Sequence, residues 1–274
     1  MRIDRLHVKN FKGFQDREFS FHPRFNLIVG VNGTGKTSVL DALAIAVGSW
    51  FLGIRGYDTR PIRLQEVLLA SFEAENIHDD GRQTVGLHWE PQYPCSVEAI
   101  GEVLGNHVSW LRSLNTPGGR TTYGEAAAIK NLAANADASV RSGDQVLLPL
   151  ISYYGTGRLW NVPREQAQVK DEKAITRKEA LSRLAGYRNS VDPRLSVAEL
   201  VRWIARQSWI SFQQGSQPSS LYEMVRKAIV GCIEGATHLY FDARFGEVIV
   251  EMVQQGAQPF NNLSDGQRCM LAMV

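Results

Sequence analysis

The chain has 274 residues, of which 44% are hydrophobic and 21% charged, and its net charge at pH 7 is +2. This length allows a full hydrophobic core, and the composition is that of a soluble globular protein. The small net charge excludes a polycation, so any affinity for nucleic acid requires a local basic surface. Charged residues at the N-terminus argue against a signal peptide, and no apolar run reaches transmembrane length. Three cysteines without metal-ligand spacing, Cys95, Cys232 and Cys269, favour a reduced, cytosolic protein. Together with the N-terminus and the short apolar runs, they lead us to expect a cytoplasmic protein with no membrane partner.

Residues 1–24 alternate between apolar and polar side chains on either side of a turn at Lys12-Gly13. This pattern predicts an antiparallel β-hairpin. The apolar run at 25–29 then predicts a buried strand, and 35 to about 50 form a helix that is apolar on nearly every side. A glycine-rich loop connects the strand to the helix.

This loop fits the pattern G-x-x-x-x-G-K-[ST], with Gly30, Gly35, Lys36 and Thr37 at the fixed positions. Glycines allow successive backbone N–H groups to face an anion, and the helix N-terminus adds its positive dipole end. Lys36 reaches the β- and γ-phosphates, and the Thr37 hydroxyl ligates Mg²⁺. We therefore predict that this loop binds ATP and Mg²⁺. The predicted binding residues are Asn32, Gly33, Thr34, Gly35, Lys36, Thr37 and Ser38. The alternative is a glycine-rich turn that binds nothing.

The middle of the chain predicts further strands at 84–90, 107–111 and 145–154, the last of them central and buried. Thr122 and Glu125 have the spacing of a capping box that opens an alanine-rich helix ending near residue 137. The cluster His78-Asp79-Asp80 is interpreted as a solvated turn, because three adjacent side chains seldom converge on one metal ion.

Residues 158–206 contain 11 Lys or Arg against 6 Asp or Glu, a local charge of +5. This basic region is the best candidate for a surface that binds nucleic acid or an acidic partner, but sparse aromatic residues favour a solvated helical face instead. Two more capping boxes, Ser196-x-x-Glu199 and Ser220-x-x-Glu223, predict helices to about 213 and to Gly235. Segments 237–241 and 247–253 then predict a second hairpin.

The hairpin is followed by Leu263-Ser264-Asp265-Gly266-Gln267 at the start of an apolar segment. A serine hydroxyl, a glycine backbone and a helix N-terminus together suit an anion. With the loop containing Asn32, and with the turn Asn10-Phe11-Lys12-Gly13-Phe14, this stretch resembles the ATPase heads of the SMC/RecF-like branch of the ABC superfamily. The resemblance implies that Lys12 lies near the nucleotide phosphates. It also implies that Ser264, Gly266 and Gln267 face the γ-phosphate held by a second copy of the chain.

Three stretches resemble PtuA-type ATPases of antiphage systems: 153–160 with Arg158, 182–193, and the helix around Trp203. This narrower resemblance implies an HNH-type nuclease partner switched by ATP in antiviral defence. For Arg158, a surface arginine and a functional role are equally good interpretations. The alternative functions are a non-hydrolysing, ATP-gated scaffold and a RecF-type DNA-repair ATPase that binds duplex DNA.

The expected fold is therefore an α/β, ABC-type P-loop NTPase head spanning 1–274. It has a mixed sheet, an N-terminal antiparallel hairpin and a helical insertion at about 158–233. Heads of this class continue into a Walker B strand, which carries the residues that hold Mg²⁺ and orient the attacking water. No such strand is found within 1–274, so we expect an incomplete head without catalytic residues of its own.

Overall fold

The structure is a computed structural model that describes residues 1–77, 83–155, 182–188, 190–192, 197–215, 217–264 and 266–268. It divides into two compact units, which we treat separately. The first comprises Met1–Tyr153 and Lys178–Asp192, and the second Tyr154–Arg177 and Pro193–Val274. The predictions for Arg158, Ser196, Asp265, Cys269, the turn at 78–80 and most of the basic region lie outside the described residues.

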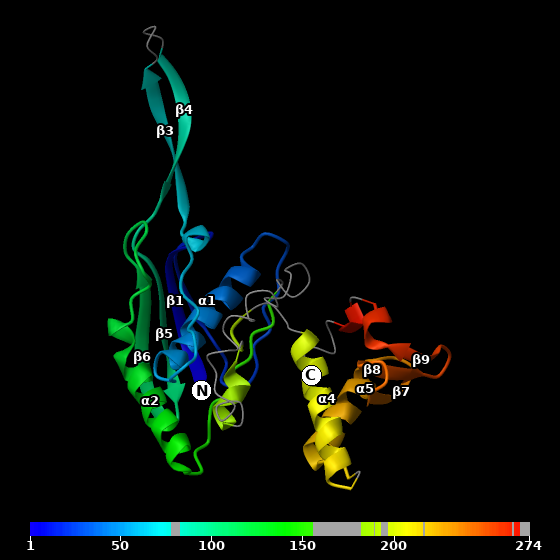
Figure 1. The fold of residues 1–274 in the computed structure, drawn as a ribbon. Coiled ribbons are helices and arrows are strands. Elements are labelled where there is room, and N and C mark those ends of the chain that lie inside the picture. Colours follow the sequence, from blue (N-terminus) through cyan, green and yellow to red (C-terminus); the bar gives the residue numbers. More distant parts are fainter. Residues whose placement is uncertain are drawn as a thin grey trace. The chain divides into compact units, whose positions relative to one another are not determined.

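The first unit contains a four-stranded sheet in the order β2-β1-β5-β6, with every neighbouring pair antiparallel (Figure 1). The strands are β1 (Arg2–Phe11), β2 (Phe14–Ser20), β5 (Cys95–Val103) and β6 (Asn106–Leu114). The predicted N-terminal hairpin is confirmed, with Phe11 opposite Phe14 at its turn. The predicted strand at 107–111 forms most of β6, whereas β5 was not predicted.

Two helices pack on the sheet: α1 (Lys36–Gly48), continued by the short helix η1 (Ser49–Leu52), and α2 (Ala127–Ser142), preceded by η3 (Gly124–Ala126). Alternate sheet residues face the helices in a single core, including Leu6, Val8, Val97, Ala99 and Trp110. This is the alternation expected of a sheet with one buried face. The observed architecture confirms the predicted α/β class, although each described sheet is antiparallel.

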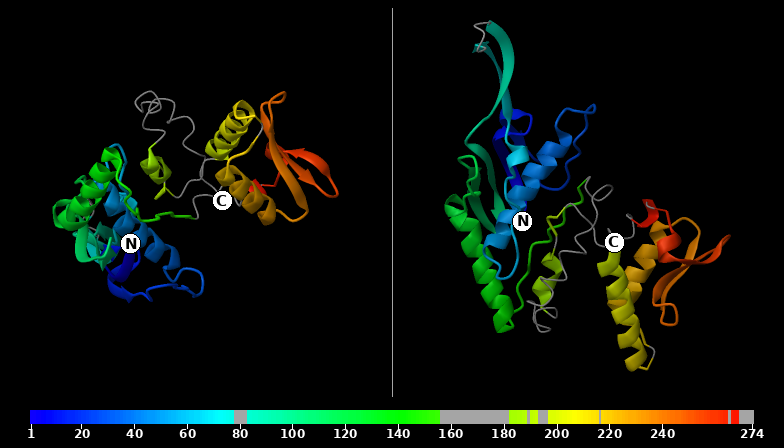
Figure 2. Two further views of the ribbon diagram at one scale, coloured as in Figure 1. Left: turned by 90° about the horizontal axis from the view of Figure 1, so that it is seen from below. Right: turned by 45° about the horizontal axis from the view of Figure 1, so that its top comes forward.

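A long two-stranded ribbon, β3 (Leu69–Ile77) with β4 (Gln83–Pro91), extends away from the four-stranded sheet (Figures 1 and 2). It follows a short helix, η2 (Leu64–Glu66). The predicted strand at 84–90 is confirmed as β4, while β3 was not predicted.

Two predicted strands, 25–29 and 145–154, are wrong, because both segments lack regular secondary structure. Val29 is 80% exposed and Leu150 97% exposed, although Ile28 and Ile151 still pack on the core. A strand needs a neighbour to take its backbone hydrogen bonds. Within the described ranges, no strand pairs with either segment.

The second unit packs α4 (Val197–Gln213) and α5 (Ser220–Cys232) against the sheet β7-β8-β9 (Figure 1). The strands are β7 (Ala236–Asp242), β8 (Glu247–Met252) and β9 (Gly256–Pro259), so the predicted second hairpin is confirmed. A turn of 3-10 helix, η7 (Phe260–Asn262), leads from β9 to Ser264.

Two predicted helix caps differ from the structure. The Thr122 hydroxyl accepts from the backbone N–H of Ser113 at 3.1 Å instead of capping a helix, and regular α2 begins only at Ala127. The cap of α5 is Ser219, whose hydroxyl accepts from Tyr222 N–H at 3.2 Å, and not Ser220. Another short helix, η6 (Arg183–Tyr187), is capped by Ser182.

Candidate nucleotide site

The glycine-rich loop ends at Gly35, which is the N-cap of α1. Gly33 has φ 87° and Gly35 φ 89°, a left-handed conformation that side chains other than glycine rarely adopt. A Cβ atom on Gly35 would also lie 2.5 Å from Cζ of Phe14, whereas one on Gly33 would meet nothing. The sequence pattern therefore matches a backbone that requires glycine.

Lys36, the first residue of α1, directs its ammonium group back over the loop. Its Nζ donates to the carbonyl oxygens of Gly30 and Val31, each at 2.7 Å. The Thr34 hydroxyl donates to Val31 O at 2.9 Å. No acidic side chain lies in the first turn of α1, so its positive end is not neutralised locally. The side chains of Asn32 and Thr37 are exposed, and Ser38 is half-buried.

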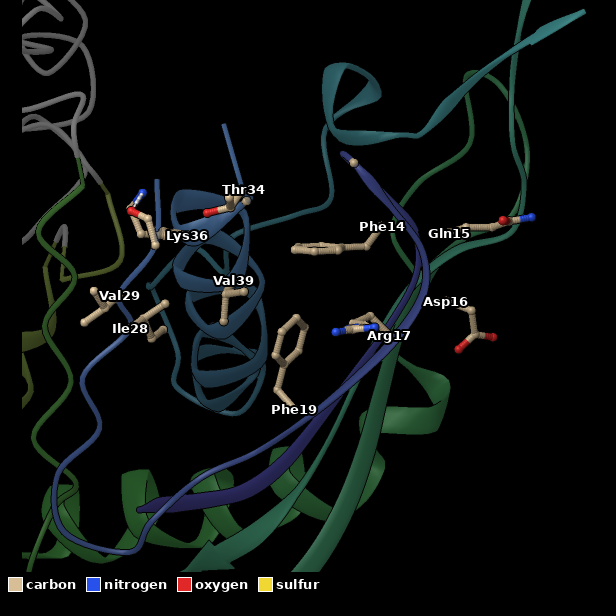
Figure 3. A pocket seen from close by; sticks show the side chains of 13 residues that line it. Phe14, Gln15, Asp16, Arg17, Phe19, Ile28, Val29, Thr34, Lys36 and Val39 are labelled. Atoms are coloured by element: carbon tan, nitrogen blue, oxygen red, sulfur yellow. Dashed lines mark hydrogen bonds between the residues drawn. The ribbon is translucent and has the colours of Figure 1, made fainter. Parts of the chain in front are cut away.

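A cavity of about 550 Å³ lies between this loop and β2 (Figure 3). Its size falls within the range of small-molecule sites. The rings of Phe14 and Phe19 point toward the loop and α1, whereas Asp16 points away. The two rings meet edge to face with their centroids 5.4 Å apart. Sequence analysis did not assign this aromatic wall, and the only available signal was the proximity of Phe14 to the Lys12-Gly13 turn.

Lys12 lies beside this cavity, but its side chain belongs to a cluster of charges around α1. Its Nζ hydrogen-bonds Asp41 and lies 3.9 Å from Glu66. Arg60 donates to Asp41 at 2.9 Å and to Glu66 at 2.7 Å. The Tyr153 hydroxyl donates to Asp41 at 2.7 Å, and burial, followed by this hydrogen bond, raises the Tyr153 pKa. Asp41 was not assigned a role from the sequence.

The signature-like segment lies in the second unit. Ser264 and Gln267 cap each other: the Gln267 N–H donates to the Ser264 hydroxyl at 3.3 Å, and the Ser264 N–H donates to Gln267 Oε1 at 3.0 Å. Gly266 is the first described residue of the helical turn that follows. This arrangement is the helix start that the sequence predicted, and it places the Ser264 hydroxyl at an exposed helix N-terminus.

Other site classes find no support in the part of the chain that the structure covers. Among the described residues, no three His, Cys, Asp or Glu side chains are grouped to hold a metal ion. In the same residues, no helix is both long and apolar enough to span a bilayer. Thr37 remains the predicted Mg²⁺ ligand.

The glycine-rich loop opens a helix that packs on a β-sheet, as in P-loop proteins, although the segment 25–29 before the loop is not a strand. Residues 5–207 match the family model described as "AAA domain". Because this match covers most of the 274 residues, the chain belongs to that family.

Two curated relatives are similar to part of this chain. The DNA replication and repair protein RecF of Salmonella arizonae is 30% identical over 106 residues, which cover 37% of this chain and 28% of RecF. RecF of Cronobacter sakazakii is 31% identical over 134 residues, covering 45% of this chain and 35% of RecF. The chain thus spans about a third of these relatives. The SMC head domain from Thermotoga maritima aligns with 100% of this chain and 70% of its own, at 14% identity and a TM-score of 0.39. The family match therefore gives an AAA domain, and the RecF matches show that part of the chain is similar to RecF.

Proposed function

We propose that this chain binds Mg²⁺-ATP in its glycine-rich loop. The observation that carries the proposal is the loop itself, where two left-handed glycines precede a helix N-terminus and the Lys36 ammonium lies over the loop carbonyls. Lys36 would exchange those carbonyls for phosphate oxygens, which are stronger, charged acceptors. The Thr37 hydroxyl would hold Mg²⁺, which would neutralise part of the phosphate charge. The aromatic cavity beside the loop would accept the base.

Binding is tested by calorimetric titration of the purified chain with Mg²⁺-ATP. Lys36→Ala removes a charge-assisted contact worth about 1.5–3 kcal/mol, so we expect affinity to fall roughly 10- to 100-fold. Lys9→Ala is the matched control, because Lys9 is an exposed lysine on β1 and does not line the cavity. Equal affinity of the wild type and Lys36→Ala would refute the assignment.

We further propose that two ATP-bound copies pair head to tail, with Ser264, Gly266 and Gln267 of one copy covering the loop of the other. The exposed, capped helix start at Ser264 supports this role. In the specific form suggested by the sequence resemblance, the paired ATPase switches an HNH-type nuclease in antiviral defence. A scaffold that binds ATP without turnover would form the same pair, and ATP hydrolysis assays distinguish the two.

The similarity to RecF supports a second candidate, a DNA-repair ATPase that binds duplex DNA. That function requires a basic surface, and the region 158–206 is the candidate. Phosphate contacts release counterions, so duplex affinity should fall steeply with salt. Absence of salt-dependent duplex binding, with and without ATP, would contradict this candidate.

A further inference from the structure

The charge cluster around α1 has one member that differs from the rest in its exposure. The side chains of Asp41, Arg60 and Glu66 are 10%, 4% and 3% exposed, whereas that of Lys12 is 27% exposed. The two cations and two carboxylates balance one another. Arg60 contacts both carboxylates through one nitrogen, and Tyr153 supplies a further hydrogen bond to Asp41. Asp41 therefore keeps two other donors even without Lys12, the buried Arg60 and the half-buried Tyr153.

The backbone of Lys12 is fixed, so only its side chain is free to change partner. Its N–H donates to Glu66 O at 2.6 Å, and its φ of 50° belongs to the tight turn between β1 and β2. The next two residues, Gly13 and Phe14, line the cavity together with Gly35 and Lys36. Asp41 lies five residues after Lys36, about 7.5 Å along α1 at 1.5 Å per residue. Lys12 is therefore next in sequence to two residues that line the cavity, while its ammonium group is paired with Asp41.

We infer that Asp41 is a positioning residue that holds Lys12 away from the nucleotide site until a triphosphate competes for it. The inference rests on the proposed nucleotide-binding function. A ligand shifts such an equilibrium only by its difference in affinity for the two states. The apparent affinity for triphosphate is then lowered by the fraction of molecules in which Lys12 is paired with Asp41. Asp41 thus sets the affinity for ATP without touching ATP.

The test compares Mg²⁺-ATP affinity in a double-mutant cycle. Asp41→Asn keeps the side-chain shape but weakens the hold on Lys12, and we expect ATP to bind up to about tenfold more tightly if Lys12 is held nine-tenths of the time. In a Lys12→Ala background the same substitution should change nothing. Asp137→Asn is the matched control, since Asp137 is also buried and paired with arginine but contacts Arg55 and Arg141 instead. Unchanged affinity in Asp41→Asn, or equal tightening without Lys12, would overturn the inference.

A milder variant keeps the inference testable if Asp41→Asn fails to fold. Tyr153→Phe removes one hydroxyl donor from Asp41 and leaves the carboxylate freer to hold Lys12. We expect ATP affinity to fall roughly two- to threefold, an effect absent in the Lys12→Ala background. No change, or a change independent of Lys12, counts against the inference. Failure of the proposed function would look different, because the wild type itself would then bind no Mg²⁺-ATP.

Discussion

At the scale of single residues, Gly35 satisfies two independent constraints, its positive φ and the Phe14 ring at its Cα. Gly33 satisfies only the first, which makes it a natural control. We expect Gly33→Ala to reduce the free energy of unfolding by about 1 kcal/mol, and Gly35→Ala by clearly more. In a Phe14→Ala background, the extra loss of unfolding free energy caused by Gly35→Ala relative to Gly33→Ala should disappear. Urea denaturation measures these values, and equal losses for both glycines would show that the ring contact has no energetic effect.

His7, on the outer face of the sheet, predicts a pH dependence. Its hydrogen bond with Asp16 raises the pKa of His7 above the ordinary value of 6.5, against the opposing effect of burial, and Glu98 lies 3.7 Å away. Because the folded pKa exceeds the unfolded one, this stabilisation is complete below about pH 6.5 and is lost as pH rises through the folded pKa.

The side chains of His7 and Asp16 are 37% and 61% exposed, so water screens the pair and its effect on stability should be small. We expect wild type to exceed His7→Gln in unfolding free energy by more at pH 5.5 than at pH 8.5. Asp16→Asn should weaken the same pH dependence. A wild-type advantage that is identical at both pH values would contradict the assignment.

At the scale of elements, the sheet and the ribbon carry tryptophans in opposite environments. Trp110 on β6 is 1% exposed and donates its indole N–H to Ala46 O on α1 at 3.0 Å, whereas Trp89 on β4 is 58% exposed. Trp110→Ala should lower the free energy of unfolding by about 3–5 kcal/mol, and Trp89→Ala by less than about 1 kcal/mol. Comparable losses at both sites would mean that the ribbon is packed in solution.

Local patterns predicted the elements whose determinants are local. Alternation located the two hairpins, and the spacing of Gly30, Gly35 and Lys36 located the loop and the start of α1. The predicted strands at 25–29 and 145–154 are wrong because strand formation depends on a partner distant in sequence. Thr122 shows the same dependence on distant residues, because its hydroxyl accepts a hydrogen bond from the backbone N–H of Ser113 on β6 and does not cap a helix.

The charge cluster around α1 could not be predicted from sequence. Asp41 meets Arg60 across 19 residues and Tyr153 across 112, separations that carry no periodic signal. A buried arginine shows the same dependence on tertiary structure. Arg112 bonds the Thr122 carbonyl at 2.7 Å and the Thr59 hydroxyl at 3.0 Å, and burial lowers its pKa to about 10. Only the fold reveals such partners.

At the scale of the whole molecule, the two parts of the proposed ATP site lie in different compact units. Lys36 belongs to the first and Ser264 to the second. Head-to-tail pairing would explain why one chain carries both parts. Ser264→Arg should therefore leave ATP affinity within about twofold of wild type but block pairing, because it places a bulky cation where the partner's loop would dock. Gln217→Arg adds the same charge at an exposed position of the second unit and should pair normally.

The most direct test of ATP-driven pairing is the molar mass of the chain by light scattering, with and without Mg²⁺-ATP. Our account predicts that ATP doubles the mass of wild type and Gln217→Arg, and changes neither Lys36→Ala nor Ser264→Arg. A wild-type mass that stays constant while calorimetry shows bound ATP, or a doubling that persists in Ser264→Arg, would contradict it.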